Sequence, residues 1–325
     1  MAFSNTYNVT NPGSGVSNRE DLTDVLTILA PEETPVLSLA NKSKATATFN
    51  EWTVDVLATP SSTGIQEGSD ITSYTDKFAG RARLGNYIQL FRRDYMVSQL
   101  QQAVESVGPA RIAEAEAKAV REIKRDMEKT LCGDQDRSVE DGASTRYVSR
   151  GLGNWLSATG PADVPSNFRT PAGSINGAGT TLTENVFNGL VASIFTQTGT
   201  VDSLSLVAGT ALRRAVSGFA RSDNNPNENV YHVNQMATDK EITLSVNTYD
   251  SDFGIITVIN GNPACLPDAN RGYIINPNYI GVAELMSLGS TRVPDQGGGQ
   301  RGFVDGALTL QVFSPLAHGK ITALS

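Results

Sequence analysis

The sequence predicts an α+β fold, and three observations lead to that prediction. Segment 109–130 (PARIAEAEAKAVREIKRDMEKT) places apolar residues at helical spacing. Segments 46–57 and 81–98 alternate polar and apolar residues with the period of a β-strand. After residue 183, short helical and strand patterns follow one another. With 325 residues, of which 39% are hydrophobic, the chain is long enough to bury a substantial core.

The N-terminal region has two parts. Residues 1–18 are rich in Asn, Ser, Gly and Thr and show no periodicity, which predicts an extended arm. Asn18 is then a candidate N-cap for a helix that Pro31 ends. The apolar residues at helical spacing in this helix are Leu22, Val25, Leu26 and Leu29. A second short helix is expected to carry Val36, Leu37 and Leu39.

The two alternating segments predict a protruding hairpin. In 46–57, Trp52 and Val54 share one face, and in 81–98, Arg81 and Arg83 share one face while Leu84 lies on the other. A polar, Gly- and Ser-containing stretch joins them. Because a two-stranded hairpin is at best marginally stable alone in water, we expect it to contact a partner molecule.

Segment 109–130 predicts a long, polar helix of about 33 Å. Its apolar stripe is narrow and consists of Ile112, Ala115, Ala119, Ile123, Met127 and Leu131. Two i,i+4 pairs, Glu114 with Lys118 and Lys118 with Glu122, support it where packing does not. We expect the two alanines of the stripe to pack on the C-terminal strands.

The remaining chain predicts an α/β region and then mostly strands. Trp155 marks a small aromatic island, and 160–181 reads as a surface loop. Helices are expected from Thr183 to Gly199 and over 209–221, with a strand at 203–209 between them. Further strands are expected at 241–249, 253–260, 272–277 and within 307–324, and a mobile Gly-rich loop at 297–302.

Composition excludes several classes of protein. The net charge of −8 argues against a surface built to bind phosphates. No apolar run is long enough to span a membrane, and the start lacks the features of a signal peptide, so a cytoplasmic origin is expected. Cys132 and Cys265 lie far apart without a CxxC motif, which predicts reduced thiols.

A search for catalytic chemistry finds no complete motif. His232 and His318 lie in different regions, and each is expected to be structural or on the surface. HGKIT at 318–322 lacks the first glycine of a phosphate-binding loop, GLGNW at 151–155 lacks the third glycine of a dinucleotide motif, and the acidic loop after Asp134 lacks the turn glycine of a calcium loop. We therefore expect no catalytic residue, cofactor or metal. The alternative is an unfamiliar enzyme that uses only Asp and Glu.

Charged residues of the hairpin are the candidate contact residues. Its arginines could suggest nucleic acid, but the same ribbon carries Glu67, Asp76 and Asp94. Ion pairing between subunits explains both signs of charge better. The predicted inter-subunit contacts are Asp70, Lys77, Arg81, Arg83, Arg92 and Arg93.

The order of these elements resembles one family over essentially the whole chain. An arm, a long hairpin, a long spine helix, an α/β domain and returning strands resemble the major capsid proteins of tailed bacteriophages, the Johnson fold. Five short sequence segments are also similar to one branch of that family: NREDL, TPVLSLA, NEWTVDVLA, DSDFGIITVI and SPLAHGKITAL.

The resemblance implies a division of the chain. It gives an N-terminal arm with short helices at 1–45, an extended loop at 46–95 that lies over a neighbouring subunit, and a peripheral domain with the spine helix at 96–135. An axial domain would occupy 136–240, and the strands of 241–325 would complete both domains.

The resemblance also implies a function and partners. The chain would self-assemble as hexamers and pentamers into an icosahedral shell, part of the virion, that encloses double-stranded DNA without sequence-specific binding. Assembly would occur in the host bacterial cytoplasm, with a portal, a separate scaffolding protein because the arm is short, and in some phages a decoration protein. No covalent crosslink is expected: Lys77 is the only lysine of the loop, and nothing in the sequence places an acid beside its target. The alternative within this resemblance is the shell of an encapsulin-like bacterial nanocompartment.

Overall fold

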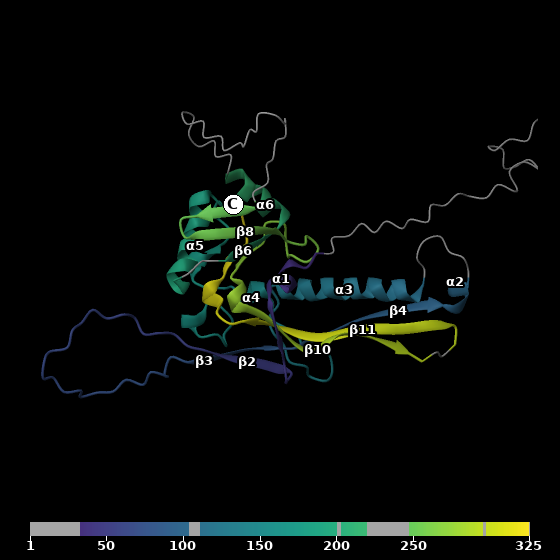
Figure 1. Ribbon diagram of the computed structural model, residues 1–325, viewed down its shortest axis with the longest axis horizontal. Helices are drawn as coiled ribbons and strands as arrows, with labels where there is room; N and C mark the ends of the chain where they lie inside the picture. The colour runs from purple at the N-terminus through teal and green to yellow at the C-terminus, as the bar shows by residue number, and fades with distance from the viewer. Residues whose placement is uncertain (1–32, 104–110, 200–202, 220–246, 295–296, 325) are drawn as a thin grey trace, which may run out of the picture.

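The computed structural model describes residues 33–103, 111–199, 203–219, 247–294 and 297–324. Figure 1 shows a flat, elongated lobe that contains the longest helix, a compact α/β lobe beside one end of it, and a hairpin that projects away from both. The helix expected after Asn18, most of the strand expected at 241–249, and His232 lie outside the described ranges.

The elongated lobe is a four-stranded sheet covered by one helix. The sheet order is β1-β10-β11-β4, with β1 parallel to β10 and the other pairs antiparallel. The bounds are β1 Asn41–Lys44, β4 Gln89–Ser98, β10 Ile280–Val293 and β11 Gly299–Val312; α2 Gln99–Ala103 follows β4. Helix α3, Ile112–Cys132, packs on β4 and β11.

The apolar stripe of α3 is the contact between the two layers. Ala119, Ile123, Met127 and Leu131 are buried in the same cluster as aromatic and aliphatic side chains of the sheet. The sheet residues are Phe91, Tyr95, Val304 and Leu308. Ala119 is only 3% exposed and Ala115 is partly buried against the cluster, so the predicted packing of the alanines is confirmed. The ion pair of Lys118 with Glu122 is also present, at 3.9 Å.

A buried carboxylate attaches the start of the described chain to α3. Helix α1, Pro35–Leu39, is the second short helix expected from the sequence. The backbone N–H groups of Val36 and Leu37 donate to the two carboxylate oxygens of Glu128, each at 2.9 Å. Burial raises the pKa of Glu128, and the two backbone hydrogen bonds oppose that rise. Glu128 thus satisfies first-turn donors of α1 that have no partner within the helix.

The compact lobe is a six-stranded sheet with two helices. The sheet order is β5-β12-β9-β6-β8-β7. The bounds are β5 Ile175–Asn176, β6 Leu204–Ala208, β7 Thr248–Ser251, β8 Gly254–Asn260, β9 Gly272–Ile275, β12 Gly319–Ile321, α5 Glu184–Thr198 and α6 Thr210–Phe219. The Thr183 hydroxyl caps α5 by accepting from Val186 N, and Gly199 ends it with φ 70°, as the sequence predicted.

The stretch 160–181, expected at the surface, is partly core. Val164 and Phe168 are buried in the main cluster together with Trp155. Phe168 ends the short turn η1, Ser166–Phe168, and Trp155 ends the short helix α4, Leu152–Trp155. The other short turns are η2 Ala172–Ser174, η3 Pro277–Tyr279 and η4 Pro315–Ala317. The prediction was wrong because a polar, Pro-rich composition shows where turns occur and not which single side chains they bury.

The Gly-rich stretch 297–302 was expected to be a mobile loop, but strand β11 begins within it, at Gly299. Gly302 pairs with Tyr95, and a Cβ on Gly302 would lie 2.5 Å from the Tyr95 hydroxyl oxygen. The glycine therefore leaves room for the tyrosine, whose hydroxyl lies 2.9 Å from Ser290 Oγ. Strand β1 was not predicted, because its sequence, NKSK, is wholly polar. Strand β10 was not predicted either, and its pairing with β11 contains two register shifts, which break the alternation of a regular strand.

The hairpin consists of β2 Phe49–Val54 and β3 Ala82–Tyr87, which pair in antiparallel register. The sequence predicted one continuous strand over 81–98. In the structure the run breaks at Ile88, after which β4 pairs with β11. The buried Ile88 side chain lies in a small cluster with Ala283 and Ala307, which marks the change from one sheet to the other.

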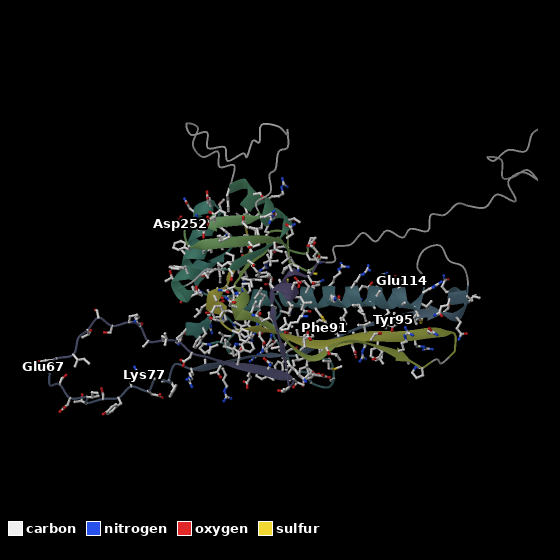
Figure 2. The ribbon with its side chains drawn as sticks, viewed as in Figure 1. Glu67, Lys77, Phe91, Tyr95, Glu114 and Asp252 are labelled. Atoms are coloured by element: carbon white, nitrogen blue, oxygen red, sulfur yellow. The ribbon has the colours of Figure 1, made fainter. Side chains whose placement is uncertain are left out.

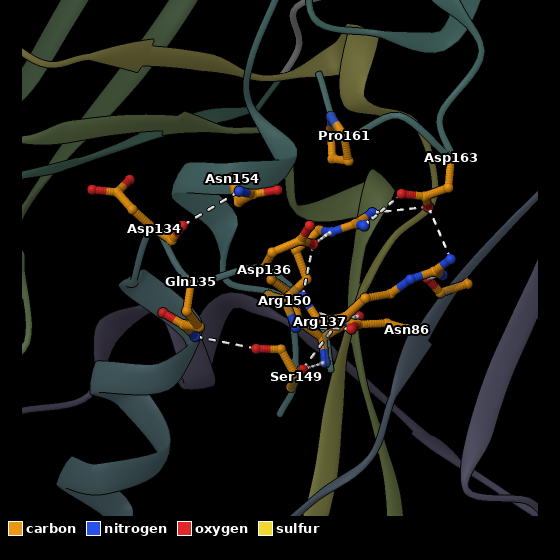
Figure 3. A network of polar contacts seen from close by, with 12 residues as sticks. Asn86, Asp134, Gln135, Asp136, Arg137, Ser149, Arg150, Asn154, Pro161 and Asp163 are labelled. Atoms are coloured by element: carbon orange, nitrogen blue, oxygen red, sulfur yellow. Dashed lines mark hydrogen bonds and ion pairs between the residues drawn. The ribbon is translucent and has the colours of Figure 1, made fainter. Parts of the chain in front are cut away.

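A polar network holds the base of the hairpin to strand β11 and to the segment before the compact lobe (Figure 3). The Arg150 side chain is 1% exposed and donates to Asp136 at 2.6 Å and to both carboxylate oxygens of Asp163 at 3.1 and 2.6 Å. Its backbone N–H donates to Asn86 of β3 at 2.8 Å, and Asn86 donates to the Leu310 carbonyl of β11 at 2.9 Å. One arginine therefore links the hairpin to the segment before the compact lobe.

Arg137 adds a second link to the same base. It donates to the backbone carbonyl of Gly85 in β3, and it pairs with Asp163 at 3.2 Å. Its guanidinium lies 5.0 Å from the ring centre of Phe49. The shared Asp163 has a lowered pKa because hydrogen bonding and charge from Arg150, with charge from Arg137, outweigh its burial.

His318 is buried between backbone groups. Asn276 N donates to its Nδ1 at 3.1 Å, so the proton is on Nε2, which lies 3.3 Å from the Tyr279 carbonyl oxygen. Burial lowers the pKa of His318 to about 4. His318 is thus a structural residue, as the sequence suggested.

The variant Arg150→Met is expected to lower the free energy of unfolding by about 3 kcal/mol, because Asp136 and Asp163 lose a buried partner. Urea unfolding followed by tryptophan fluorescence measures this. Arg146→Met, at an exposed position of the same loop, is the control and should change the value by no more than about 0.5 kcal/mol. Equal effects of both changes would contradict the assigned role of Arg150.

His318 should make stability fall as the solution is acidified. Its pKa is below the ordinary value of 6.5, so the unfolded chain takes up a proton that the folded chain rejects between pH 6.5 and about 4. The loss over that window is roughly 3 kcal/mol, at about 1.4 kcal/mol per pKa unit. His318→Asn retains an acceptor without titrating, so the difference in unfolding free energy between the two proteins should shrink towards pH 4. A constant difference would disprove this.

Candidate assembly surface

The tip of the hairpin exposes apolar side chains that nothing in the described chain covers. Leu57 is 99% exposed, and Ile65 and Tyr74 are each 88% exposed. Ile71 and Phe78 in the same loop are exposed as well. Figure 2 shows this loop, with Glu67 and Lys77 labelled, extended away from both lobes. Since monomeric proteins rarely expose a concentrated apolar surface, the loop, residues 55–81, has the character of an interface.

The base of the hairpin is packed, in contrast to its tip. Trp52 of β2 faces inward, with its ring centre 5.7 Å from that of Trp155 and 6.1 Å from that of Phe313. Leu84 of β3 is 1% exposed. The paired strands, whose alternation of polar and apolar residues was predicted from the sequence, are thus packed against the body of the protein, whereas the loop between them is exposed.

Four of the six predicted contact residues lie on the hairpin. Asp70 and Lys77 are exposed in the loop, and Arg83 is exposed on β3. Arg81 pairs with Asp55 at 2.9 Å across the mouth of the loop, and its guanidinium lies 4.1 Å from the Phe78 ring centre. Since the Arg81 and Asp55 side chains are 50% and 41% exposed, this pair adds little to stability.

The other two lie on β4, in the elongated lobe. Arg92 pairs with Asp305 at 3.3 Å, and Arg93 pairs with Asp126 of α3 through two contacts of 2.6 and 2.8 Å. The hydrogen bond with Asp126 raises the pKa of Arg93. The structure thus separates the six residues into two places and gives three of the arginines carboxylate partners in their own chain. Their contacts between subunits stay predictions.

Sequence reasoning missed Arg137 and Arg150, which fix the hairpin base. Neither residue has a periodic or motif signal, because their partners are contributed by 85–86, 136 and 163 only after folding. The nearest signal was the acidic loop after Asp134, whose carboxylates accept from arginines: Asp134 pairs with Arg271 at 2.8 Å.

The rejected motifs have structural roles. Lys320 of HGKIT is in β12 and donates to the carbonyl of Gly153, in GLGNW, at 2.7 Å. Both cysteines are free and buried, and burial raises the pKa of Cys265 to about 11. Within the described ranges, no three His, Cys, Asp or Glu side chains come together as a metal site. No helix among those residues is both long and apolar enough to cross a membrane.

Comparison with solved structures identifies the fold. The capsid of a native GTA particle has a TM-score of 0.64 at 11% identity, with 100% of each chain covered. The capsid of cyanophage A-1(L) also scores 0.64, at 16% identity over 95% of this chain and 97% of that one. The capsid of cyanophage P-SCSP1u scores 0.60 at 13% identity, over 100% and 99%. The Johnson fold expected from the sequence is thereby confirmed.

Comparison with protein families decides between a phage capsid protein and the alternatives left open by the sequence, a nanocompartment shell and an unfamiliar enzyme. No curated protein sequence matches the chain. The family described as SU10 major capsid protein matches residues 3–325, which include the hairpin, helix α3 and both lobes. The chain therefore belongs to the SU10 major capsid protein family.

Proposed function

We propose that this major capsid protein forms hexamers and pentamers of an icosahedral phage head, joined by its hairpin. The observation that carries this proposal is the contrast within the hairpin. Trp52 and Leu84 at the base are packed, whereas Leu57, Ile65 and Tyr74 at the tip have no cover. A neighbouring subunit would bury these side chains, at about 25 cal/mol for each Å² of apolar area.

The two lobes suggest a division of labour. The elongated lobe, with α3 and β4, corresponds to the peripheral domain expected at 96–135, and the compact lobe to the axial domain expected at 136–240. Residues 46–95 would be the extended loop over a neighbour, although β4 already begins at Gln89. The final strands contribute to both lobes, with β11 in one sheet and β12 in the other.

Charged contacts between subunits would add specificity to the apolar contact. Asp70, Lys77 and Arg83 are exposed on the hairpin and are available to a neighbour. Arg81, Arg92 and Arg93 would contribute through the exposed parts of their guanidinium groups, since their side chains are 50%, 56% and 45% exposed despite their own-chain pairs. Such contacts set orientation more than affinity.

Further partners follow from the function as a shell. A portal, a separate scaffolding protein and in some phages a decoration protein would join assembly in the host cytoplasm. The shell would enclose double-stranded DNA without reading its sequence, and the net charge of −8 would limit retention of phosphates. The chain itself would catalyse no reaction.

Replacing Ile65, Ile71 and Tyr74 together by Ser should abolish assembly and leave the subunit folded. The three side chains are 88%, 72% and 88% exposed, so they add little to the stability of the subunit, and in the shell they would supply apolar area to a neighbour. Sedimentation and negative-stain electron microscopy measure assembly, and circular dichroism measures folding.

The matched control for this experiment is Val139→Ser, which removes an apolar side chain that is 51% exposed on a different loop. It should assemble normally. Shells of normal yield from the triple variant would refute the proposed role of the hairpin tip.

Reversing one loop charge tests the predicted ionic contacts. Lys77→Glu is expected to slow assembly several-fold at low salt and less at high salt, because screening weakens exposed charge pairs. Light scattering during assembly gives the rate. Lys42→Glu, at an exposed position of β1, is the control. The same rate for Lys77→Glu as for the unaltered protein at every salt concentration would remove Lys77 from the contact.

A further inference from the structure

One face of α3 is covered at its C-terminal end and open towards its N-terminus. Glu128, Lys124, Arg121, Ala117 and Ala113 are spaced by three or four residues and share this face. Helix α1 covers the face at Glu128, through the two backbone hydrogen bonds to the carboxylate. Further along, Lys124, Arg121 and Ala113 are exposed and Ala117 is half-buried. The face therefore continues beyond the segment that packs on it.

The open side of α3 is cationic. From Arg111 to the end of α3, the exposed charged residues are Arg111, Lys118, Arg121, Lys124 and Lys129, with Glu114 as the one exposed acid. The remaining acids turn towards partners: Glu116 pairs with Arg292 at 3.5 Å, Asp126 pairs with Arg93, and Lys118 lies 3.9 Å from Glu122. A chain with net charge −8 thus concentrates positive charge on one helix.

The described chain begins at this cationic face. A crevice of about 480 Å³ is lined by Glu33 and Thr34 at the start of the described chain together with Arg121 and Lys124 of α3. Ile259, Pro35 and Ser38 complete its lining. The residues that precede Glu33 are therefore tethered directly beside the open face.

The sequence of that segment complements the face in charge and in length. Residues 18–33 contain five acids, Glu20, Asp21, Asp24, Glu32 and Glu33, and one base, Arg19. Residues 18–30, which carry apolar residues at helical spacing, would form a helix of about 20 Å. Arg111 and Lys124 are also separated by about 20 Å along α3, at the same rise per residue.

We propose that residues 18–32 dock as an amphipathic helix on the open face of their own α3. The docked helix runs parallel to α3, since its C-terminal end joins Glu33 beside Lys124. Leu22, Val25, Leu26 and Leu29 pack over Ala113 and Ala117, whose small side chains allow close approach. The acids lie beside Lys118, Arg121 and Lys124. The short tether gives the chain's own segment a high effective concentration over that of any other occupant.

A pair of introduced cysteines tests the proposal in unassembled full-length subunits. Leu26→Cys with Ala117→Cys is expected to form a disulfide within one chain in most molecules, identified by mass spectrometry after proteolysis. Leu26→Cys with Ser144→Cys, at an exposed position of a distant loop, is the control and should not crosslink. A crosslink between two chains would assign the face to a second copy and overturn the proposal, as would no crosslink.

Hydrogen exchange gives an independent measurement. Arg121→Glu with Lys124→Glu should speed exchange of the amides of residues 20–30 about tenfold, and Asp24→Lys with Glu32→Lys added to it should restore protection. High salt should speed exchange in the unaltered protein as well. Exchange unchanged by the reversal, or protection of α3 that requires added double-stranded DNA, would overturn the proposal. Because these subunits are unassembled, the outcome is separate from that of the hairpin experiments.

Discussion

The packing of α3 on β4 and β11 is the contact on which the rest of the molecule depends. Ile123, Met127 and Leu131 form a stripe only one side chain wide, and the sheet beneath them comes from both ends of the chain. This two-layer lobe has little depth, so α3 must be long to bury enough area, and most of its circumference stays charged. A long helix with a mostly polar surface is therefore what a lobe of only two layers requires.

A thin molecule needs other means to fix its outlying segments, and charged side chains that form hydrogen bonds and ion pairs provide them. Arg150 and Arg137 bind the hairpin base to the segment that leads into the compact lobe, and Glu128 binds α1 to α3. These contacts are costly to break singly because each leaves a partner unpaired. They hold the base of the hairpin and leave its loop exposed, which suits a subunit that assembles with copies of itself.

The sequence predicted elements with strong local signals. It located helices α1, α3 and α5 and the strands of the hairpin, because their hydrophobic period or capping residues lie close together in the sequence. The strands β1 and β10, the buried Val164 and Phe168, and the strand at Gly299 were missed or assigned wrongly. For the strands, pairing with a distant segment, such as Gly302 with Tyr95, overrode a local composition that gave no strand signal. For Val164 and Phe168, burial against side chains distant in the sequence did the same.

The sequence by itself determined that this chain has a polar helix with one narrow apolar stripe, a two-stranded hairpin that is at best marginally stable alone, and no complete catalytic motif. Only the tertiary structure decided which charges are structural and which are available. Arg92 and Arg93 resemble Arg83 in the sequence, yet they meet Asp305 and Asp126, whereas Arg83 points to solvent. The physical reason is that an ion pair is defined by distance in space, and residues far apart in the chain are brought together only by the packing of the layers.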